Sequence, residues 1–92
     1  SELYRLNQRQ KLYQTQLLPQ IHDQAEASLT AYTNDEGDFA EVVRARIAEM
    51  DAEIDAMSID VDRQKTILQL NYFFVRQDAD NLATDHRNGE IQ

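Results

Sequence analysis

The chain has no cysteine and no tryptophan, and it has only one proline and two glycines among its 92 residues. The absence of cysteine excludes a disulfide framework, a cysteine-based zinc site and a thiol nucleophile. So few glycines and prolines cannot supply the turns of a β-sandwich or barrel, and they exclude collagen-like and low-complexity linker classes. No apolar run approaches the roughly 20 residues of a membrane-spanning helix. What remains, 41% hydrophobic and 28% charged residues, is typical of a water-exposed helical domain with a narrow apolar seam.

The net charge of −8 is concentrated in one part of the chain. Acidic and basic residues balance in segments 1–33 and 63–92, whereas segment 34–62 holds ten acids and two arginines. Nucleic acids and anionic lipid surfaces attract clustered lysine and arginine instead. We therefore expect no nucleic-acid partner and no membrane contact by this segment. A basic partner or a path for cations fits the charge better.

Apolar residues in the second half recur every three or four positions, which predicts a long helix over about 38–77. A strand is excluded, because a period of two would place Asp51, Glu53 and Asp55 together on one face. The recurrence lasts about five heptads, interrupted by Gln64 and Asn71, and is typical of one side of a coiled coil. We expect the contact with the first half to be made by Phe39, Val43, Ile47, Met50, Ile54, Met57, Val61 and Leu68, and the same series continues to Val75 beyond the reach of the first half.

The first half predicts a helix over about 3–33 with a kink near Pro19. Its apolar seam shifts by one residue between Leu17 and Leu18, next to the only proline. A proline inside a helix removes one backbone hydrogen bond and bends the helix, so we interpret the shift as one kinked helix. The alternative is two helices that separate before Pro19. The seam consists of Leu3, Leu6, Gln10, Tyr13 and Leu17, and then of Leu18, Ile21, Ala25, Leu29 and Tyr32.

A turn over 34–37 is predicted between the two halves. Asn34, Asp35 and Gly37 are residue types that tolerate the left-handed conformation at a helix end. Asp38, followed three residues later by Glu41, has the spacing of a capping box and predicts the start of the second helix.

Chain reversal at this turn pairs residues that are equidistant from it, such as Ile21 with Met50 and Tyr13 with Met57. Apolar residues then meet apolar residues over most of the length. The sequence therefore predicts an all-α single domain over 1–92, an antiparallel two-helix coiled-coil hairpin. A polar tail over 78–92, where the periodicity is lost, is expected to be weakly ordered. The apolar residues between Leu68 and that tail have no partner in the first half, so we expect self-association or another partner to cover Leu70, Tyr72, Phe73, Phe74 and Val75.

The sequence offers no convincing constellation for chemistry. His22 and His86 have too few potential ligands at helical spacing, and we interpret both as solvated surface residues. The acids of the turn lack the spacing of a calcium loop, the serines lack a histidine and acid partner, and there is no glycine-rich phosphate loop. A lone hairpin also lacks a cleft that could shift the pKa values of paired carboxylates. We therefore expect no catalytic residue, no metal site and no cofactor, and we expect that the chain is not an enzyme.

Several segments carry a family resemblance: Leu17-Leu18-Pro19-Gln20, Ala31-Tyr32, the run from Gly37 to Arg46 that begins Gly-Asp-Phe-Ala-Glu, and Gln69-Leu70-Asn71-Tyr72-Phe73. Together they resemble the TolC-like outer-membrane efflux channel family, and most of all its heavy-metal (CzcC/CusC-like) branch. The match covers roughly residues 12–75 without a gap. Its most specific part is the order of tyrosine, turn, Gly-Asp-Phe and acid. The chain starts without methionine in an amphipathic pattern, so we expect a fragment, the second helical hairpin of such a subunit.

The resemblance implies a periplasmic hairpin in a trimeric outer-membrane channel of a Gram-negative bacterium, which exports heavy metals. The tip of the hairpin then docks a periplasmic adaptor, which links the channel indirectly to an inner-membrane pump. Glu41 matches an acidic position that lines the constriction, whereas Arg44 stands where some members carry a second acid. Asp35 stands where many members have glycine, which leaves Gly37 to make the turn. The partner contacts implied at the tip are Tyr32, which matches a tyrosine that helps hold the mouth closed, and Asn34, Asp35, Glu36, Gly37 and Asp38.

The family interpretation also accounts for a second row of small residues. Ala45, Ala48, Ala52 and Ala56 lie beside the main seam and fit a helix with neighbours on two sides. The first alternative is a generic antiparallel coiled-coil spacer or oligomerisation module, which explains the heptads but not the Asp-Phe segment. The second is a metal-binding regulator, which only the acidic charge favours.

Overall fold

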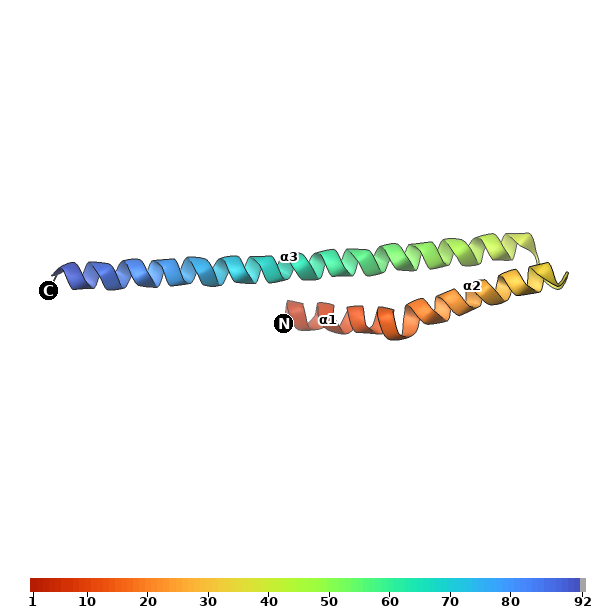
Figure 1. Cartoon of the computed structure of the whole chain (residues 1–92), viewed down its shortest axis with the longest axis horizontal. Helices are drawn as coiled ribbons and strands as arrows, with labels where there is room; N and C mark the ends of the chain where they lie inside the picture. The colour runs from red at the N-terminus through yellow and green to blue at the C-terminus, as the bar shows by residue number, and fades with distance from the viewer. Residues whose placement is uncertain (92) are drawn as a thin grey trace.

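The structure is a computed structural model that describes the backbone of residues 1–91 and the side chains of residues 1–84. This part of the chain contains helices and no strand: α1 (Glu2–Leu12), the π-helical turn η1 (Tyr13–Leu17), α2 (Leu18–Thr33) and α3 (Phe39–Ile91). α1, η1 and α2 follow one another without a break and form a first arm, which folds back along α3 (Figure 1). The molecule measures 87 × 17 × 14 Å, and its radius of gyration is 23.9 Å. A compact domain of this length would have about 12 Å, so the fold is a rod.

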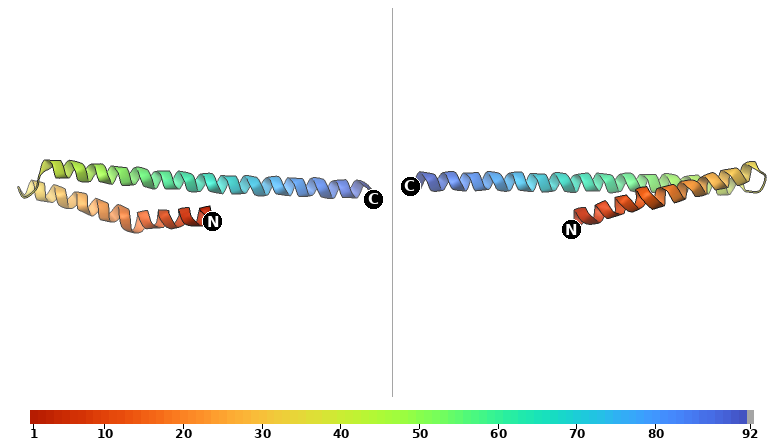
Figure 2. Two further views of the ribbon diagram at one scale, coloured as in Figure 1. Left: turned by 180° about the vertical axis from the view of Figure 1, so that it is seen from behind. Right: turned by 60° about the horizontal axis from the view of Figure 1, so that its bottom comes forward.

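The bend in the first arm lies at η1, just before Pro19, where Figure 2 shows the arm changing direction. The amide of Leu18 donates to the carbonyl of Tyr13, five residues back instead of four. Such a turn takes up one extra residue, which explains the one-residue shift of the seam between Leu17 and Leu18. The Thr15 hydroxyl also donates to the carbonyl of Lys11, a bond that favours bending. The prediction of one continuous bent arm is confirmed, but the bend is a π-helical turn before the proline.

The turn after α2 is a Schellman motif. The amide of Glu36 donates to the carbonyl of Ala31, and the amide of Asp35 donates to the carbonyl of Tyr32. Asp35 occupies the left-handed position, with φ 59°, whereas neither glycine has a positive φ. The expectation that Gly37 makes the turn is therefore wrong. Gly37 serves close approach instead, because a Cβ there would lie 3.0 Å from the Ala31 Cβ and 3.0 Å from the Tyr32 nitrogen.

The start of α3 agrees with the prediction, whereas its end does not. Asp38 caps its start as predicted, since its Oδ1 accepts from the amide of Ala40 at 3.2 Å. The predicted end near residue 77 is wrong, because α3 continues to Ile91 and takes in the segment expected to be a polar tail. The segment lacks proline and includes helix formers such as Ala79 and Leu82. Asparagine and a single glycine cost a helix only about 0.7–1 kcal/mol each, so loss of apolar periodicity does not end the helix.

The predicted register between the arms is confirmed. The Gln10 side-chain amide donates to Asp60 Oδ1 at 2.9 Å, and Arg46 donates to Glu26 Oε1 at 2.9 Å. These pairs are equidistant from the turn to within one residue. In the first arm the seam buries Leu6 and Ala25 as expected. Leu29 and Tyr32 remain exposed, because Ser28 and Ala31 take the inner positions near the turn.

The predicted contact face of α3 is wrong. The side of α3 that meets the first arm, called here the covered face, consists of Val42, Ala45, Arg46, Glu49, Ala52, Ala56, Ile59 and Asp60. The larger apolar residues expected at the contact are exposed; Met50 and Met57 retain 59% and 67% of their accessible surface. Small alanines let two helices approach closely, since the interaxial distance depends on the side chains between them. In the first arm, Leu6 is buried and Tyr13, Leu17 and Leu18 are half-buried.

Candidate functional site

The tip of the rod, residues 32–39, brings together every residue that the resemblance implied as a partner contact. The rings of Tyr32 and Phe39 face each other across the turn, with centroids 5.6 Å apart and an angle of 53°. Tyr32 is 43% exposed and Phe39 is 59% exposed. The side chains of Asn34, Asp35, Glu36 and Asp38 are all exposed around this pair, whereas Gly37 is half-buried. The tip is thus an exposed aromatic pair within a ring of negative charge.

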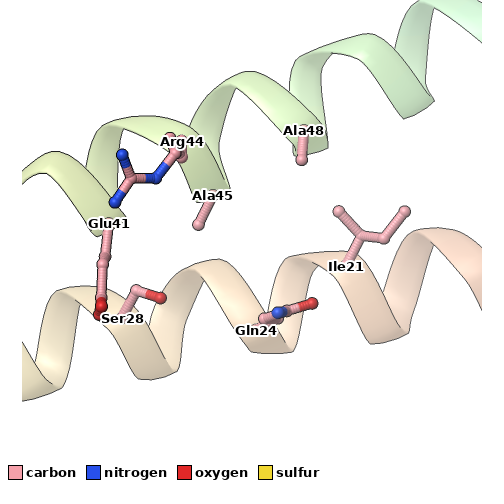
Figure 3. A pocket seen from close by; sticks show the side chains of 7 residues that line it. All are labelled: Ile21, Gln24, Ser28, Glu41, Arg44, Ala45 and Ala48. Carbon is pink, nitrogen blue, oxygen red and sulfur yellow. The ribbon is translucent and has the colours of Figure 1, made fainter.

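Glu41 lies in the first turn of α3, next to the tip, and lines a shallow groove between α2 and α3 (Figure 3). Arg44 lies beside it on α3, so a cation stands next to the acid. The groove is lined further by Ile21, Gln24, Ser28, Ala45 and Ala48. It is open to solvent and presents one acid, one base and small apolar side chains, which suits a protein side chain better than a small-molecule ligand.

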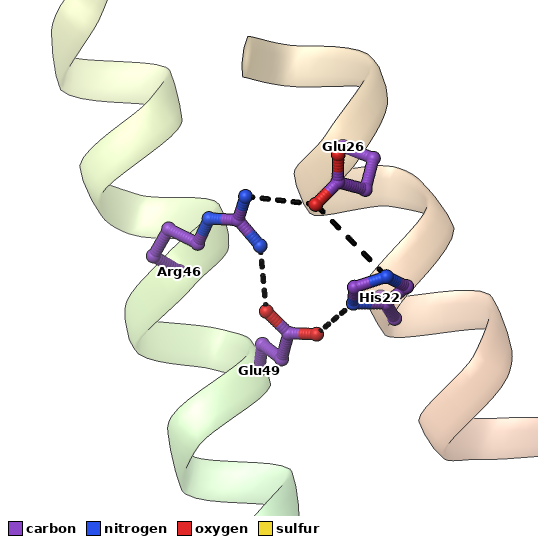
Figure 4. Close-up of polar contacts among 4 residues, drawn as sticks. All are labelled: His22, Glu26, Arg46 and Glu49. Carbon is purple, nitrogen blue, oxygen red and sulfur yellow. Dashed lines mark hydrogen bonds and ion pairs between the residues drawn. The ribbon is translucent and has the colours of Figure 1, made fainter.

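Farther from the tip, four side chains form a polar cluster that joins the two arms: His22 and Glu26 of α2, and Arg46 and Glu49 of α3 (Figure 4). Arg46 donates to Glu26 Oε1 and to Glu49 Oε1, both at 2.9 Å. His22 Nδ1 bonds Glu49 Oε2, and its Nε2 lies 3.9 Å from Glu26 Oε1. Charges of opposite sign therefore alternate around the cluster.

The cluster shifts the ionisation of its members. The hydrogen bond to Glu49 raises the pKa of His22 above its ordinary value of 6.5. The hydrogen bonds from His22 and Arg46 lower the pKa of Glu49 below 4.5. The interpretation of His22 as a solvated surface residue is therefore incomplete, because its ring is half-exposed but bonded across the arms. The predicted register places His22 opposite Glu49, so the sequence already indicated this contact. The interpretation of His86 lies outside the described side chains.

The largest exposed apolar feature runs along α3 and is called here the open stripe: Val43, Ile47, Met50, Ile54, Met57, Val61, Leu68 and Val75. Each of these residues is between 39% and 67% exposed. Ile54 lies two residues from Ala52 of the covered face, so the two project about 200° apart around the helix. The sequence pattern predicted this stripe as an apolar seam, but the predicted contact with the first arm is wrong.

The stripe continues beyond the end of the first arm, where Figure 1 shows α3 extending alone. The aromatic residues of this overhang are exposed, as predicted: Tyr72 is 66% exposed, Phe73 57% and Phe74 60%. The rings of Phe73 and Phe74 meet edge to face, with centroids 5.9 Å apart. The first arm therefore leaves this segment of α3 uncovered.

Within the part of the chain described by the structure, no three histidine, cysteine, aspartate or glutamate side chains are placed to share a metal ion. None of the described helices combines the length and the apolarity that a membrane crossing requires. The acids of the tip are exposed, whereas Glu49 and Asp60 of α3 are half-buried and bond the first arm. Three exposed features of the described surface are candidates for contact with another protein: the tip, the groove and the open stripe.

Comparison with family models, curated proteins and solved structures found no match to this chain.

Proposed function

We propose that the chain is a periplasmic tunnel hairpin of an outer-membrane efflux channel subunit, an antiparallel coiled coil whose tip docks the adaptor of a heavy-metal export pump. The observation that carries the proposal is that α3 has two apolar faces, one covered by the first arm and one exposed. The first arm covers Ala52 and Ile59 to 7% and 3% exposure, while Ile54 and Met57 keep more than half of their surface. A helix in the wall of a tunnel has neighbours on both sides and needs two such faces.

The tip supports the same function. Asp35, Glu36, Asp38 and Glu41 gather within seven residues at one end of an 87 Å rod. Their mutual repulsion costs stability, and the dipole of α3 offsets it only near its first turn. Apart from the cap that Asp38 gives α3, the hairpin does not need this charge for its own fold, whereas a basic adaptor surface would be attracted to it. Tyr32 and Phe39 add an exposed apolar centre to the acidic ring, the arrangement of a protein contact.

The test is made in the full-length protein that carries this chain. Asp35→Lys and Gly37→Leu alter the charge and the shape of the tip, and they should abolish most metal export without lowering channel abundance or trimer assembly. Asp55→Lys is the matched control, because it makes the same charge change on an exposed position of α3 away from the tip. Full export by both tip variants would overturn adaptor docking. Flanking sequence without a second hairpin and amphipathic strands would overturn the channel itself.

A second function, an oligomerisation module, is favoured by the heptad order of the open stripe, which resembles one strand of a coiled coil. In that case the tip plays no part, and the tip variants leave the activity of the parent protein intact. Truncation of the open stripe, by alanine at Ile54 and Met57 together, would then impair assembly and activity alike.

A further inference from the structure

The open stripe has the residue order of a two-stranded parallel coiled coil. In heptad notation, position a holds Ile47, Ile54, Val61, Leu68 and Val75, and position d holds Val43, Met50, Met57, Gln64 and Asn71. Four of the five a residues are β-branched, and the d residues at Met50 and Met57 are long and unbranched. β-branched residues at a with leucine at d favour two strands over three or four, and methionine shares with leucine the absence of a branch at Cβ.

Two amide side chains, Gln64 and Asn71, lie between the apolar residues of the open stripe. They specify the direction of pairing. In a parallel, in-register pair each a or d residue meets its own copy, so Gln64 faces Gln64 and Asn71 faces Asn71. In an antiparallel pair each d residue faces an a residue, and every a residue from 47 to 75 is apolar. An amide left against an apolar side chain costs about 1–3 kcal/mol. Gln64 donates one bond to Asp60 Oδ2, which leaves its carbonyl oxygen and second N–H for the partner.

The charges beside the stripe agree with the same arrangement. In a parallel pair, each g residue lies near the e residue five positions later in the partner. Arg46 then meets Asp51, and Asp60 meets Lys65, so both charged pairs are attractive. Glu53 meets the neutral Ser58, and no like charges meet at these positions between 46 and 65. Asp51 and Lys65 are exposed in the single chain, whereas Arg46 and Asp60 lie at the edge of the covered face and already bond Glu26, Glu49 and Gln10, so these charges would be shared with an existing contact.

We propose that the open stripe pairs with the open stripe of a second copy of this chain, parallel and in register, over residues 43–75. The contact spans about 48 Å at the helical rise of 1.5 Å per residue. It ends before Asp78, the next d residue, where two carboxylates would meet. The first arm lies on the covered face of each α3 and leaves the a and d residues of the stripe exposed. The pairing is that of the free chain: in a trimeric channel a neighbouring tunnel helix would take the same stripe, because a two-fold pair does not fit a three-fold ring.

The chain has no cysteine, so single introduced cysteines report the geometry directly. Met50→Cys, Val61→Cys and Leu68→Cys should each yield a disulfide-linked dimer under mild oxidation, because each position meets its own copy. Asp55→Cys and Asp62→Cys, on the side away from the stripe, are the controls and should cross-link far less. Equal cross-linking at stripe and control positions would overturn the proposal. So would cross-linking at only one stripe position, which is the antiparallel outcome.

Charge reversal tests the register by sedimentation of the cysteine-free chain. Asp51→Lys places a lysine next to Arg46 of the partner, and Lys65→Glu places an acid next to Asp60 of the partner. Each should raise the dimer dissociation constant by roughly two- to tenfold, the range of exposed ion pairs. Asp55→Lys is the matched control and should not raise it. Circular dichroism keeps the result unambiguous, since all three exposed variants should remain helical. A wild-type chain that stays monomeric at 100-fold the concentration needed for cross-linking would overturn the proposal.

Discussion

The two faces of α3 differ in composition and in exposure to solvent. The covered face is built from small residues and a polar cluster, yet Ala52 and Ile59 are buried. The open stripe is larger and more hydrophobic, yet Ile47, Met50 and Ile54 are more than half exposed. The more hydrophobic face is therefore not the one that the hairpin uses for its own fold. The difference shows that one face of α3 closes the hairpin, and it is the basis of the proposal that the other face contacts a neighbour.

The largest effect on stability is expected when the same substitution, isoleucine to alanine, is made on each of the two faces. Ile59→Ala removes a side chain that is 3% exposed, and it should lower the free energy of unfolding by about 2–4 kcal/mol through lost burial and a cavity. Ile54→Ala removes one that is 59% exposed, and it should change that free energy by less than about 0.5 kcal/mol. Urea unfolding followed by circular dichroism, at concentrations where the chain is monomeric, measures both.

Equal losses for the two isoleucine variants would mean that the open stripe contributes to the fold of the single chain. The covered and open faces would then no longer be distinct. A loss for Ile54→Ala that appears only at high concentration would instead sharpen the distinction, because it would place the stripe in an intermolecular contact.

A smaller effect on stability is expected from substitutions at the tip. The turn there orients α3 so that its covered face meets the first arm. Gly37→Ala adds a Cβ that would lie 3.0 Å from the backbone nitrogen of Tyr32, and it should cost about 1–2 kcal/mol. Asp35→Gly is the matched change in the same turn. It relieves the left-handed conformation of a non-glycine residue and should stabilise the hairpin by about 0.5–1 kcal/mol. Thermal unfolding of both variants provides the measurement, and destabilisation by Asp35→Gly would contradict the role assigned to Asp35.

The smallest effect concerns pH and the polar cluster on the covered side. The raised pKa of His22 means that its contribution to stability is complete below about pH 6.5 and is lost as the pH rises through the raised value. The lowered pKa of Glu49 means that its contribution is present above about pH 4.5 and is lost as the pH falls through the lowered value. The cluster should therefore stabilise the hairpin most between about pH 4.5 and 6.5.

His22→Gln isolates this contribution, because every other titrating group remains in both proteins. The difference in melting temperature between wild type and His22→Gln should be greatest near pH 5.5 and should shrink by pH 8.5. The open stripe contains no ionisable residue, so the dimer dissociation constant measured by sedimentation of the cysteine-free chain should change little over the same range. A difference in melting temperature that stays constant with pH would show that His22 acts without its charge.

Much of this molecule follows from local rules that the amino-acid sequence carries by itself. The 3.6-residue period predicts both helices, the one-residue shift marks the bend, and Asn34 to Asp38 predict the turn and the cap. Equal distances from that turn determine the register, which places Gln10 near Asp60 and His22 near Glu49. The implied tip residues also follow, because residues 32–39 lie at the reversal whatever the helices do elsewhere.

The tertiary structure alone decided which face of α3 meets the first arm. Hydrophobic periodicity identified two apolar rows on α3, and hydrophobicity favoured the row with Met50 and Ile54. Packing favoured the row with Ala52 and Ala56, because alanines allow the close approach that lets the large residues of the first arm fill the space. The polar cluster depends on the same choice, since His22 reaches Glu49 only when that face is turned inward. A one-dimensional pattern contains the period of a helix, but the rotation of one helix against another depends on the shapes that meet between them.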